Sequence, residues 1–240
     1  MPEFAGLTAD QMKEADLAAF EEYGITLAQL MENAGKAVAN ACRIPLRGVK
    51  GKNILVLAGK GKNGGDAIVA ARFLKGWGAN VMIILAEEIS DKLVFRQLET
   101  TKKTGADSMA FNMKNIDIAR DNIRLSNLII DGLIGCGLKG DPRPPVSTLI
   151  DFANESGAPI VSVDVPSGMD ATTGEAHDPC IRAAVTVTLA FPKAGLLKKE
   201  SLPYVGDLYV ADIGIPPKVY KRFGLGETDL FAESDLVKVC

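Results

Sequence analysis

Histidine is almost absent from this sequence, because His177 is the only one among 240 residues. A single imidazole largely excludes histidine triads and multi-histidine metal sites, so any catalysis must rest on carboxylates, amides, hydroxyls or the backbone. Cysteine is scarce as well, and the four cysteines (Cys42, Cys136, Cys180 and Cys240) show no C-x-x-C spacing. Structural zinc is therefore disfavoured and no disulfide framework is indicated, which is typical of a reduced, cytoplasmic enzyme.

The chain also lacks an excess of positive charge and a long apolar run. Its net charge of −3 and its pI near 5.4 argue against a nucleic-acid binder that works by neutralising phosphates. The longest apolar runs are far too short for a membrane span. Residues 1–4 contain neither a basic region nor an apolar signal core. We therefore expect a protein with no nucleic-acid partner and no membrane partner.

Apolar segments of strand length alternate with segments of helical periodicity from Asn53 onward. The predicted strands are 53–58, 80–85, 107–111, 126–131, 159–164, 184–190 and 206–212. The predicted helices between them are 65–77, 91–104, 115–122 and 146–156. Two further helices should open the chain, because Thr8 and Thr26 are each followed three residues later by glutamine, the form of a capping box. This order predicts an α/β fold, a mostly parallel sheet with helices on both faces.

The final predicted strands are close together in sequence, so an antiparallel edge is plausible there. We assign residues 1–226 to one domain. Residues 227–240 are expected to form a peripheral tail with a turn and a short helix, or the start of a linker to a further domain.

A glycine-rich turn, residues 59–66, follows the first predicted strand and precedes a predicted helix. Unblocked backbone N–H groups at a helix start form a ready phosphate site. Gly59, Gly61 and Gly64 satisfy the dinucleotide fingerprint G-x-G-x-x-G. Asn63 and Asp66 are not needed for that fingerprint, which indicates a function other than that of a plain nicotinamide dehydrogenase.

Two other predicted strands also end in polar residues. Asp131 closes a buried run and precedes a glycine-rich segment, although Asp131-Gly132 could equally be an ordinary turn. Asp164 ends a strand that should be buried on both faces, where a charge needs a partner, an ion or a catalytic role; the alternative is a structural cap of the next turn. Ser167 follows in that turn. Since ligands gather at the carboxyl ends of parallel strands, these oxygens suit a hard cation such as magnesium, potassium or calcium.

Several segments in this order resemble one known family. They are Leu30 to Gly35, Gly59 to Asp66, Asp131 to Asp141, Val163 to Asp170, Phe191 to Leu196, and Gly206-Asp207 leading to Asp212 to Pro216. Each segment is a weak signal, but the ordered set is highly specific and runs across nearly the whole chain. On these segments the chain resembles the NAD(P)HX epimerases, the YjeF N-terminal domain family.

The resemblance implies a Rossmann-like three-layer αβα sandwich, commonly homodimeric. It implies an isomerase that interconverts the R and S forms of hydrated NAD(P)H, in which water has added at C6 of the nicotinamide ring. A companion dehydratase, separate or fused C-terminally, then restores NAD(P)H from the S form. The residues implied to bind substrate are Lys62, Asn63, Gly64, Gly65, Asp66, Gly135, Cys136, Gly137, Leu138, Lys139, Gly140, Asp141 and Asp164. Asn63, Asp131 and Ser167 would hold one potassium ion (K+) per subunit. We take Asp164 as the catalytic, proton-transferring group.

Two residues depart from the family pattern. Lys62 stands where asparagine is usual, and it could reach a substrate phosphate or face solvent. Ala67 stands where glycine is usual, and its methyl group should be tolerated unless backbone packs there.

Two rival interpretations remain. A Rossmann dehydrogenase would use Glu87 or Glu88 to bind a ribose, but Asp66 then places a negative charge where the pyrophosphate would settle. A non-catalytic scaffold of the same fold, which dimerises and contacts RNA, is disfavoured by the intact polar set and the acidic chain.

Overall fold

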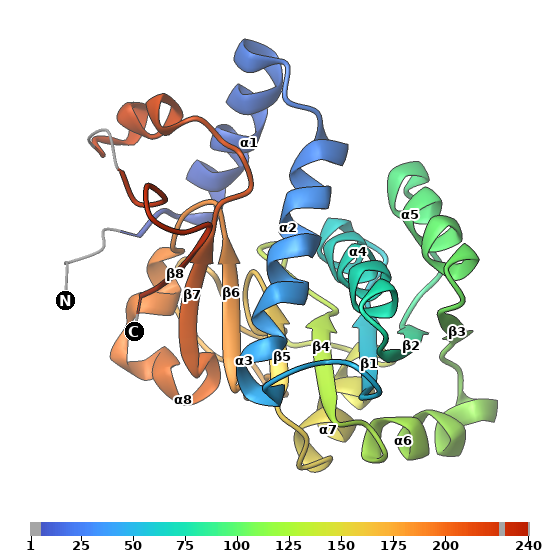
Figure 1. Ribbon diagram of the computed structural model, residues 1–240. Coiled ribbons are helices and arrows are strands. Elements are labelled where there is room, and N and C mark those ends of the chain that lie inside the picture. The colour runs from blue at the N-terminus through green and yellow to red at the C-terminus, as the bar shows by residue number, and fades with distance from the viewer. Residues whose placement is uncertain (1–5, 226–228, 240) are drawn as a thin grey trace.

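The strands form one sheet in the order β3-β2-β1-β4-β5-β6-β7-β8 (Figure 1). The structure is a computed structural model that describes residues 6–225 and 229–239. The strands are β1 (Asn53–Ala58), β2 (Asn80–Leu85), β3 (Asp107–Ala110), β4 (Leu128–Gly132), β5 (Ile160–Val163), β6 (Val185–Leu189), β7 (Asp207–Ala211) and β8 (Leu236–Lys238). All neighbouring pairs are parallel except β7 and β8. The predicted parallel sheet is confirmed.

The strand order reverses between β1 and β4, and this reversal positions the site. From β1 the chain runs outward through β2 and β3, and then returns to place β4 on the other side of β1. Their register aligns Leu57 with Asp131 and Ala58 with Gly132, so the two strands end level with each other. The connections leave in opposite directions from this point, which opens a crevice at the carboxyl ends of the strands.

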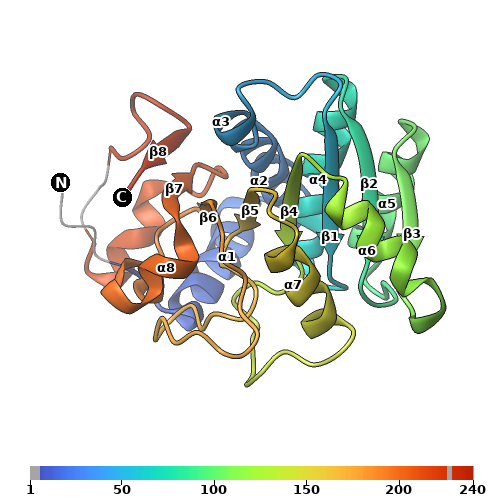
Figure 2. The same ribbon diagram turned by 90° about the horizontal axis from the view of Figure 1, so that it is seen from below.

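Helices cover both faces of the sheet, as the alternation predicts (Figures 1 and 2). On one face lie α2 (Leu27–Ala41), α4 (Lys62–Gly76) and α5 (Lys92–Lys103); on the other lie α6 (Ile116–Arg124) and α7 (Val146–Glu155). Because side chains alternate along a strand, Ile54 and Val56 pack toward the first layer and Leu55 and Leu57 toward the second. The three-layer αβα sandwich is confirmed.

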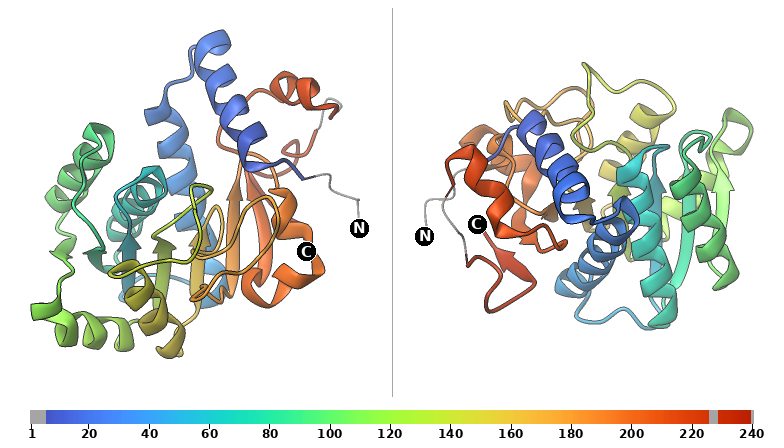
Figure 3. Two further views of the ribbon diagram at one scale, coloured as in Figure 1. Left: turned by 180° about the vertical axis from the view of Figure 1, so that it is seen from behind. Right: turned by 90° about the horizontal axis from the view of Figure 1, so that it is seen from above.

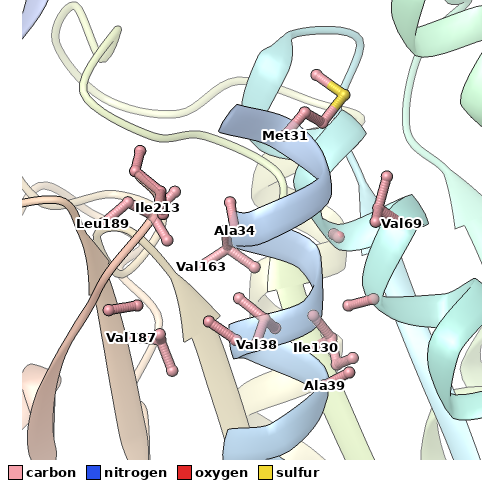
Figure 4. Close-up of a cluster of buried hydrophobic side chains, with 14 of the residues drawn as sticks. Met31, Ala34, Val38, Ala39, Val69, Ile130, Val163, Val187, Leu189 and Ile213 are labelled. Atoms are coloured by element: carbon pink, nitrogen blue, oxygen red, sulfur yellow. The ribbon is translucent and has the colours of Figure 1, made fainter. Parts of the chain in front are cut away.

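Helix α2 lies against α4 and over the centre of the sheet, where its small residues allow close approach (Figure 4). A Cβ atom on Gly35 would lie 2.4 Å from Cγ1 of Val69 and 2.8 Å from the carbonyl oxygen of Asp66. Ala34 and Val38 are buried against the sheet in the same contact. This crossing fixes the start of α4, which carries the glycine-rich turn.

Helix α1 (Ala9–Tyr23) lies over the carboxyl ends of the strands rather than on a face of the sheet (Figure 3). The predicted capping box at Thr8 is formed, and so is the one at Thr26. A parallel bridge joins Leu7 to Lys193, and the side chain of Arg222 bonds both carboxylate oxygens of Glu22 at 2.9 Å. Helix α1 is therefore held by segments from the last third of the chain.

The remaining elements are short. They are α3 (Arg43–Leu46), α8 (Leu202–Val205) and the 3-10 helices η1 (Met113–Asn115), η2 (Ala194–Leu197), η3 (Lys199–Ser201) and η4 (Pro217–Phe223). Predicted and observed boundaries agree closely, except that α4 begins at Lys62 rather than at residue 65. The expectation of a short helix in the tail is wrong, because residues 236–238 form β8 and supply the antiparallel edge. Residues 227, 228 and 240 of the predicted tail lie outside the described residues.

Candidate active site

A cavity of about 750 Å³ opens at the carboxyl ends of β1, β2, β4, β5 and β6, with α1 as one wall. Most of the residues predicted to bind substrate line it: Lys62, Asn63, Asp66, Gly135, Cys136, Gly137, Leu138, Lys139, Asp141 and Asp164. Gly64, Gly65 and Gly140 are outside the lining, and Asp131 and Ser167 are fully buried beside it. The structure thus brings the three predicted strand ends into one site, and the individual roles of these residues stay predictions.

The glycine-rich turn owes its composition chiefly to packing of the protein on itself. A Cβ atom on Gly59 would lie 2.0 Å from the carbonyl oxygen of Leu133, and one on Gly64 would lie 2.0 Å from that of Gly59. Gly61, the N-cap of α4, has open space instead and carries no side-chain cap. The first turn of α4 therefore presents backbone N–H groups and the positive end of the helix dipole to the cavity.

Ala67 is accommodated by a glycine on the neighbouring strand end. A Cβ atom on Gly132 would lie 2.4 Å from the Cβ atom of Ala67, so backbone does pack at this position. Because residue 132 has no side chain, the methyl group fits. The other departure, Lys62, is exposed in the first turn of α4 and lines the cavity, where it can reach an anionic ligand.

Asp131 is fully buried and accepts four hydrogen bonds. The hydroxyl of Ser162 and the backbone N–H of Ser167 donate to Oδ2 at 2.8 and 2.9 Å. The hydroxyl of Ser167 and the N–H of Leu133 donate to Oδ1 at 2.5 and 3.3 Å. Burial raises the pKa of Asp131, and these hydrogen bonds act in the opposite direction. The carboxyl group thereby joins the loops that follow β4 and β5.

Asn63 lies beside this network with an unused polar group. Its buried Nδ2 atom has no hydrogen-bond partner in the described part of the chain, and its Oδ1 atom faces Gly135. A buried amide without partners is costly and uncommon. Within residues 6–225 and 229–239, no three His, Cys, Asp or Glu side chains are grouped for a metal ion. The amide, carboxylate and hydroxyl oxygens of Asn63, Asp131 and Ser167 suit a hard cation of low charge instead.

Asp164 projects its carboxyl group into the cavity from a strained position. Its φ angle of 66° lies in the left-handed region, which is uncommon for residues other than glycine. Oδ1 accepts a bond from the ammonium group of Lys193 and another from the N–H of Leu189 at 3.1 Å. Oδ2 lies 3.2 Å from the thiol of Cys136. Such outliers cluster at functional sites, where the surrounding structure holds them in place.

Lys193 also lines the cavity, and the sequence analysis did not single it out. Its side chain is 2% exposed, and its ammonium group bonds Oδ1 of Asp164 and the carbonyl oxygen of Leu189, the latter at 2.7 Å. Burial is the largest single effect and lowers the pKa of Lys193, but the attraction of the Asp164 carboxylate, together with its hydrogen bond and the charges of Cys136 and Asp16, outweighs it, and the net shift is upward. The residue lies within the Phe191-to-Leu196 segment of the resemblance, so the sequence contained a signal for it.

Two further carboxyl groups face the same cavity. Asp66 is nearly buried, and burial, reinforced by the charges of Asp164 and Asp16, raises its pKa well above the usual range. Asp16, on α1, also lines the cavity and was not predicted; burial raises its pKa too, and Lys193 opposes the shift. The site therefore combines an ion-paired carboxylate with two carboxyl groups whose pKa values are raised.

Comparison with known proteins identifies the family of this chain. The sequence model of the family described as YjeF-related protein N-terminus matches residues 27–195, which include the glycine-rich turn, Asp131, Asp164 and Lys193. The chain belongs to the YjeF N-terminal family. The family assignment made from the ordered motifs is confirmed, and it leaves no support for a plain Rossmann dehydrogenase.

Relatives in the family carry two kinds of name. The bifunctional NAD(P)H-hydrate repair enzyme Nnr of Pyrobaculum aerophilum is 40% identical over 92% of this chain, which covers 44% of that protein. The NAD(P)H-hydrate epimerase of Dehalogenimonas lykanthroporepellens is 36% identical over 91% of this chain and 86% of its own length. A crystal structure of yeast ynu0 superposes with a TM-score of 0.84 at 28% identity, covering 98% of this chain and all of that one. This YjeF N-terminal chain spans less than half the length of its bifunctional relatives.

Proposed function

We propose that this YjeF N-terminal chain is an NAD(P)H-hydrate epimerase, which interconverts the R and S forms of NADHX or NADPHX. The names and the extent of its relatives support this proposal. The observation that carries it is the Asp164–Lys193 pair in the wall of a cavity placed where α/β sheets bind nucleotides. The reaction belongs to nicotinamide nucleotide repair, because it supplies the epimer that a dehydratase can use.

Epimerisation requires a proton transfer at the hydroxyl on C6. On one route the C6–O bond breaks: the lone pair of the ring nitrogen forms a double bond to C6, and the hydroxyl leaves as water with a proton from the enzyme. Water then adds to the opposite face of C6 and returns the proton. If the ring opens instead, the hydroxyl loses its proton and the ring nitrogen gains one, and closure reverses both. On the ring-opening route the Asp164 carboxylate can take the proton from the hydroxyl and pass it to the ring nitrogen, and Lys193 holds that carboxylate in position. On the bond-breaking route the proton that leaves with water would come from the ammonium group of Lys193 through Asp164, and the water that adds would return it.

We also propose a bound potassium ion, one per subunit, held by Asn63, Asp131 and Ser167. Support comes from the oxygen atoms of these three side chains and from the complete burial of Asp131 and Ser167 beside the cavity. When bound, the ion would supply a fixed positive charge beside the cavity. We expect the melting temperature to rise by about 2 °C or more in potassium relative to lithium chloride, and an Asp131→Asn variant to lose that rise.

The remaining assignments are proposals that rest on the family. We propose a homodimer that works with an NAD(P)HX dehydratase, which bifunctional relatives carry in the same polypeptide according to their names. No helix in the described residues is long and apolar enough to cross a membrane. A cytoplasmic location is proposed from the cysteines, since Cys42, Cys136 and Cys180 are free thiols.

The test measures the interconversion of purified R and S NADHX in the presence and in the absence of potassium. Chromatography monitors the two epimers. We expect turnover by the wild-type chain and a loss of at least about a hundredfold in kcat for Asp164→Asn, with KM little changed. Asp117→Asn, an exposed aspartate on α6 outside the cavity, is the matched control. A wild-type rate for Asp164→Asn would remove Asp164 from the mechanism, whereas no turnover under either condition would favour the non-catalytic, RNA-binding scaffold.

A further inference from the structure

The cavity extends well beyond the Asp164–Lys193 pair, as far as the end of β2. Lys60, which follows β1, and Glu87, which follows β2, both line it. The Nζ atom of Lys60 lies 2.7 Å from Oε1 of Glu87. The proton transfer proposed above uses neither residue, so this end of the cavity requires its own explanation.

The distance between the two ends suits a dinucleotide. The strands β2, β1, β4 and β5 are successive neighbours in the sheet, which places their ends about 14 Å apart at a spacing of about 4.8 Å per strand. The uncapped start of α4 lies between them, with Lys62 in its first turn. A nicotinamide ring at Asp164 would therefore place the pyrophosphate at the start of α4 and the adenosine ribose beside Glu87.

Asp66 does not oppose this orientation. Burial raises the pKa of its carboxyl group well above the usual range, which favours the neutral form beside the pyrophosphate position. Lys62 adds positive charge in the same turn. Burial of Asp66 and the nearby charge of Lys62 therefore weaken the objection that Asp66 would repel a pyrophosphate.

The charges around the ribose position distinguish two forms of the substrate. Glu87, Glu88 and Asp91 fall within six residues after β2, and Asp91 caps α5 through the N–H groups of Leu93 and Val94. A carboxylate at this place in a dinucleotide fold accepts ribose hydroxyls, whereas a 2′-phosphate needs an arginine or another free cation. Lys60 is already paired with Glu87.

We infer that Glu87 binds the ribose 2′-hydroxyl of the adenosine half, so that this chain prefers NADHX to NADPHX. Lys60 positions the Glu87 carboxylate and reduces, without abolishing, the repulsion of a 2′-phosphate. This inference rests on the proposed function, since it names the preferred form of that substrate and the direction in which it lies across the sheet.

The experiment compares kcat/KM for NADHX and NADPHX in the wild type, in Glu87→Gln and in a matched control, Glu88→Gln. Glu88 is exposed and lies outside the cavity lining. We expect the wild type to favour NADHX about tenfold or more, Glu87→Gln to reduce that ratio at least about fivefold, and Glu88→Gln to leave it unchanged. Binding of NADH and NADPH, measured by calorimetry, should change in the same direction.

The possible results distinguish a failure of this inference from a failure of the proposed epimerase function. An active wild type whose ratio is the same in Glu87→Gln, or one that prefers NADPHX, would overturn the inference and leave the epimerase standing. A wild type that epimerises neither substrate would refute the proposed function and, with it, the preference between those substrates.

Discussion

Replacing Lys193 by methionine would retain most of the volume of its stem and remove its ammonium group. The Asp164 carboxylate would then lose its ionic partner, and the carbonyl oxygen of Leu189 would lose a donor. Removing one member of a buried ion pair costs about 3–5 kcal/mol. Because the Asp164 side chain keeps 14% exposure to the cavity, water recovers part of that cost. We expect the variant to lose about 3 kcal/mol of unfolding free energy.

Urea unfolding followed by circular dichroism would measure this loss, with Asp164→Asn and the double variant completing the cycle. The double variant should be less destabilised than the sum of the single variants by about 2 kcal/mol. The pKa of Lys193 is raised above its ordinary 10.5, so its contribution is complete below that pH and is lost only above it. The loss should therefore be constant from pH 6 to 9. Additive effects, or a loss below about 1 kcal/mol, would refute the reasoning.

Three other substitutions, one of them a matched control, test separate parts of the site. Burial raises the pKa of Asp66, so its neutral form contributes stability that is complete at acid pH and is lost as pH rises through the raised pKa. We therefore expect Asp66→Asn to gain stability relative to wild type between pH 4.5 and 8.5, as measured by urea midpoints; a constant difference would contradict this. Gly64→Ala would place a Cβ atom 2.0 Å from the carbonyl oxygen of Gly59 and should lose about 3 kcal/mol or more, or fail to fold. Gly61→Ala, which meets open space, should stay within about 1 kcal/mol of wild type, and equal losses for the two would show that the turn can relax.

Most of the fold could be predicted because its signals are local. The strands are short apolar runs between turn residues, and both capping boxes at Thr8 and Thr26 form as their spacing indicates. The tail was harder to assign. Residues 236–238 form a strand because β7 leaves an edge for them to pair with, and that edge is supplied by residues about 30 positions away.

The location of a site residue was predictable where a polar residue ends an apolar run in the sequence, as Asp131 and Asp164 do. It was not predictable where chemistry depends on contacts between distant segments. Lys193 looks like an ordinary surface residue until β5 and β6 place it against Asp164, and Asp16 joins the cavity only because α1 lies above the sheet. The reason for the glycines was also hidden, since Gly64 faces the backbone of its own turn rather than a ligand.

The position of α1 determines when this site can exist during synthesis. The helix is made first, but its attachments are to Thr172, Lys193 and Arg222, more than 160 residues later. A nascent chain that has emerged only as far as β4 can pair β1 with its neighbours, yet α1 still lacks these three attachments. The cavity wall is therefore completed only when the last third of the chain has left the ribosome.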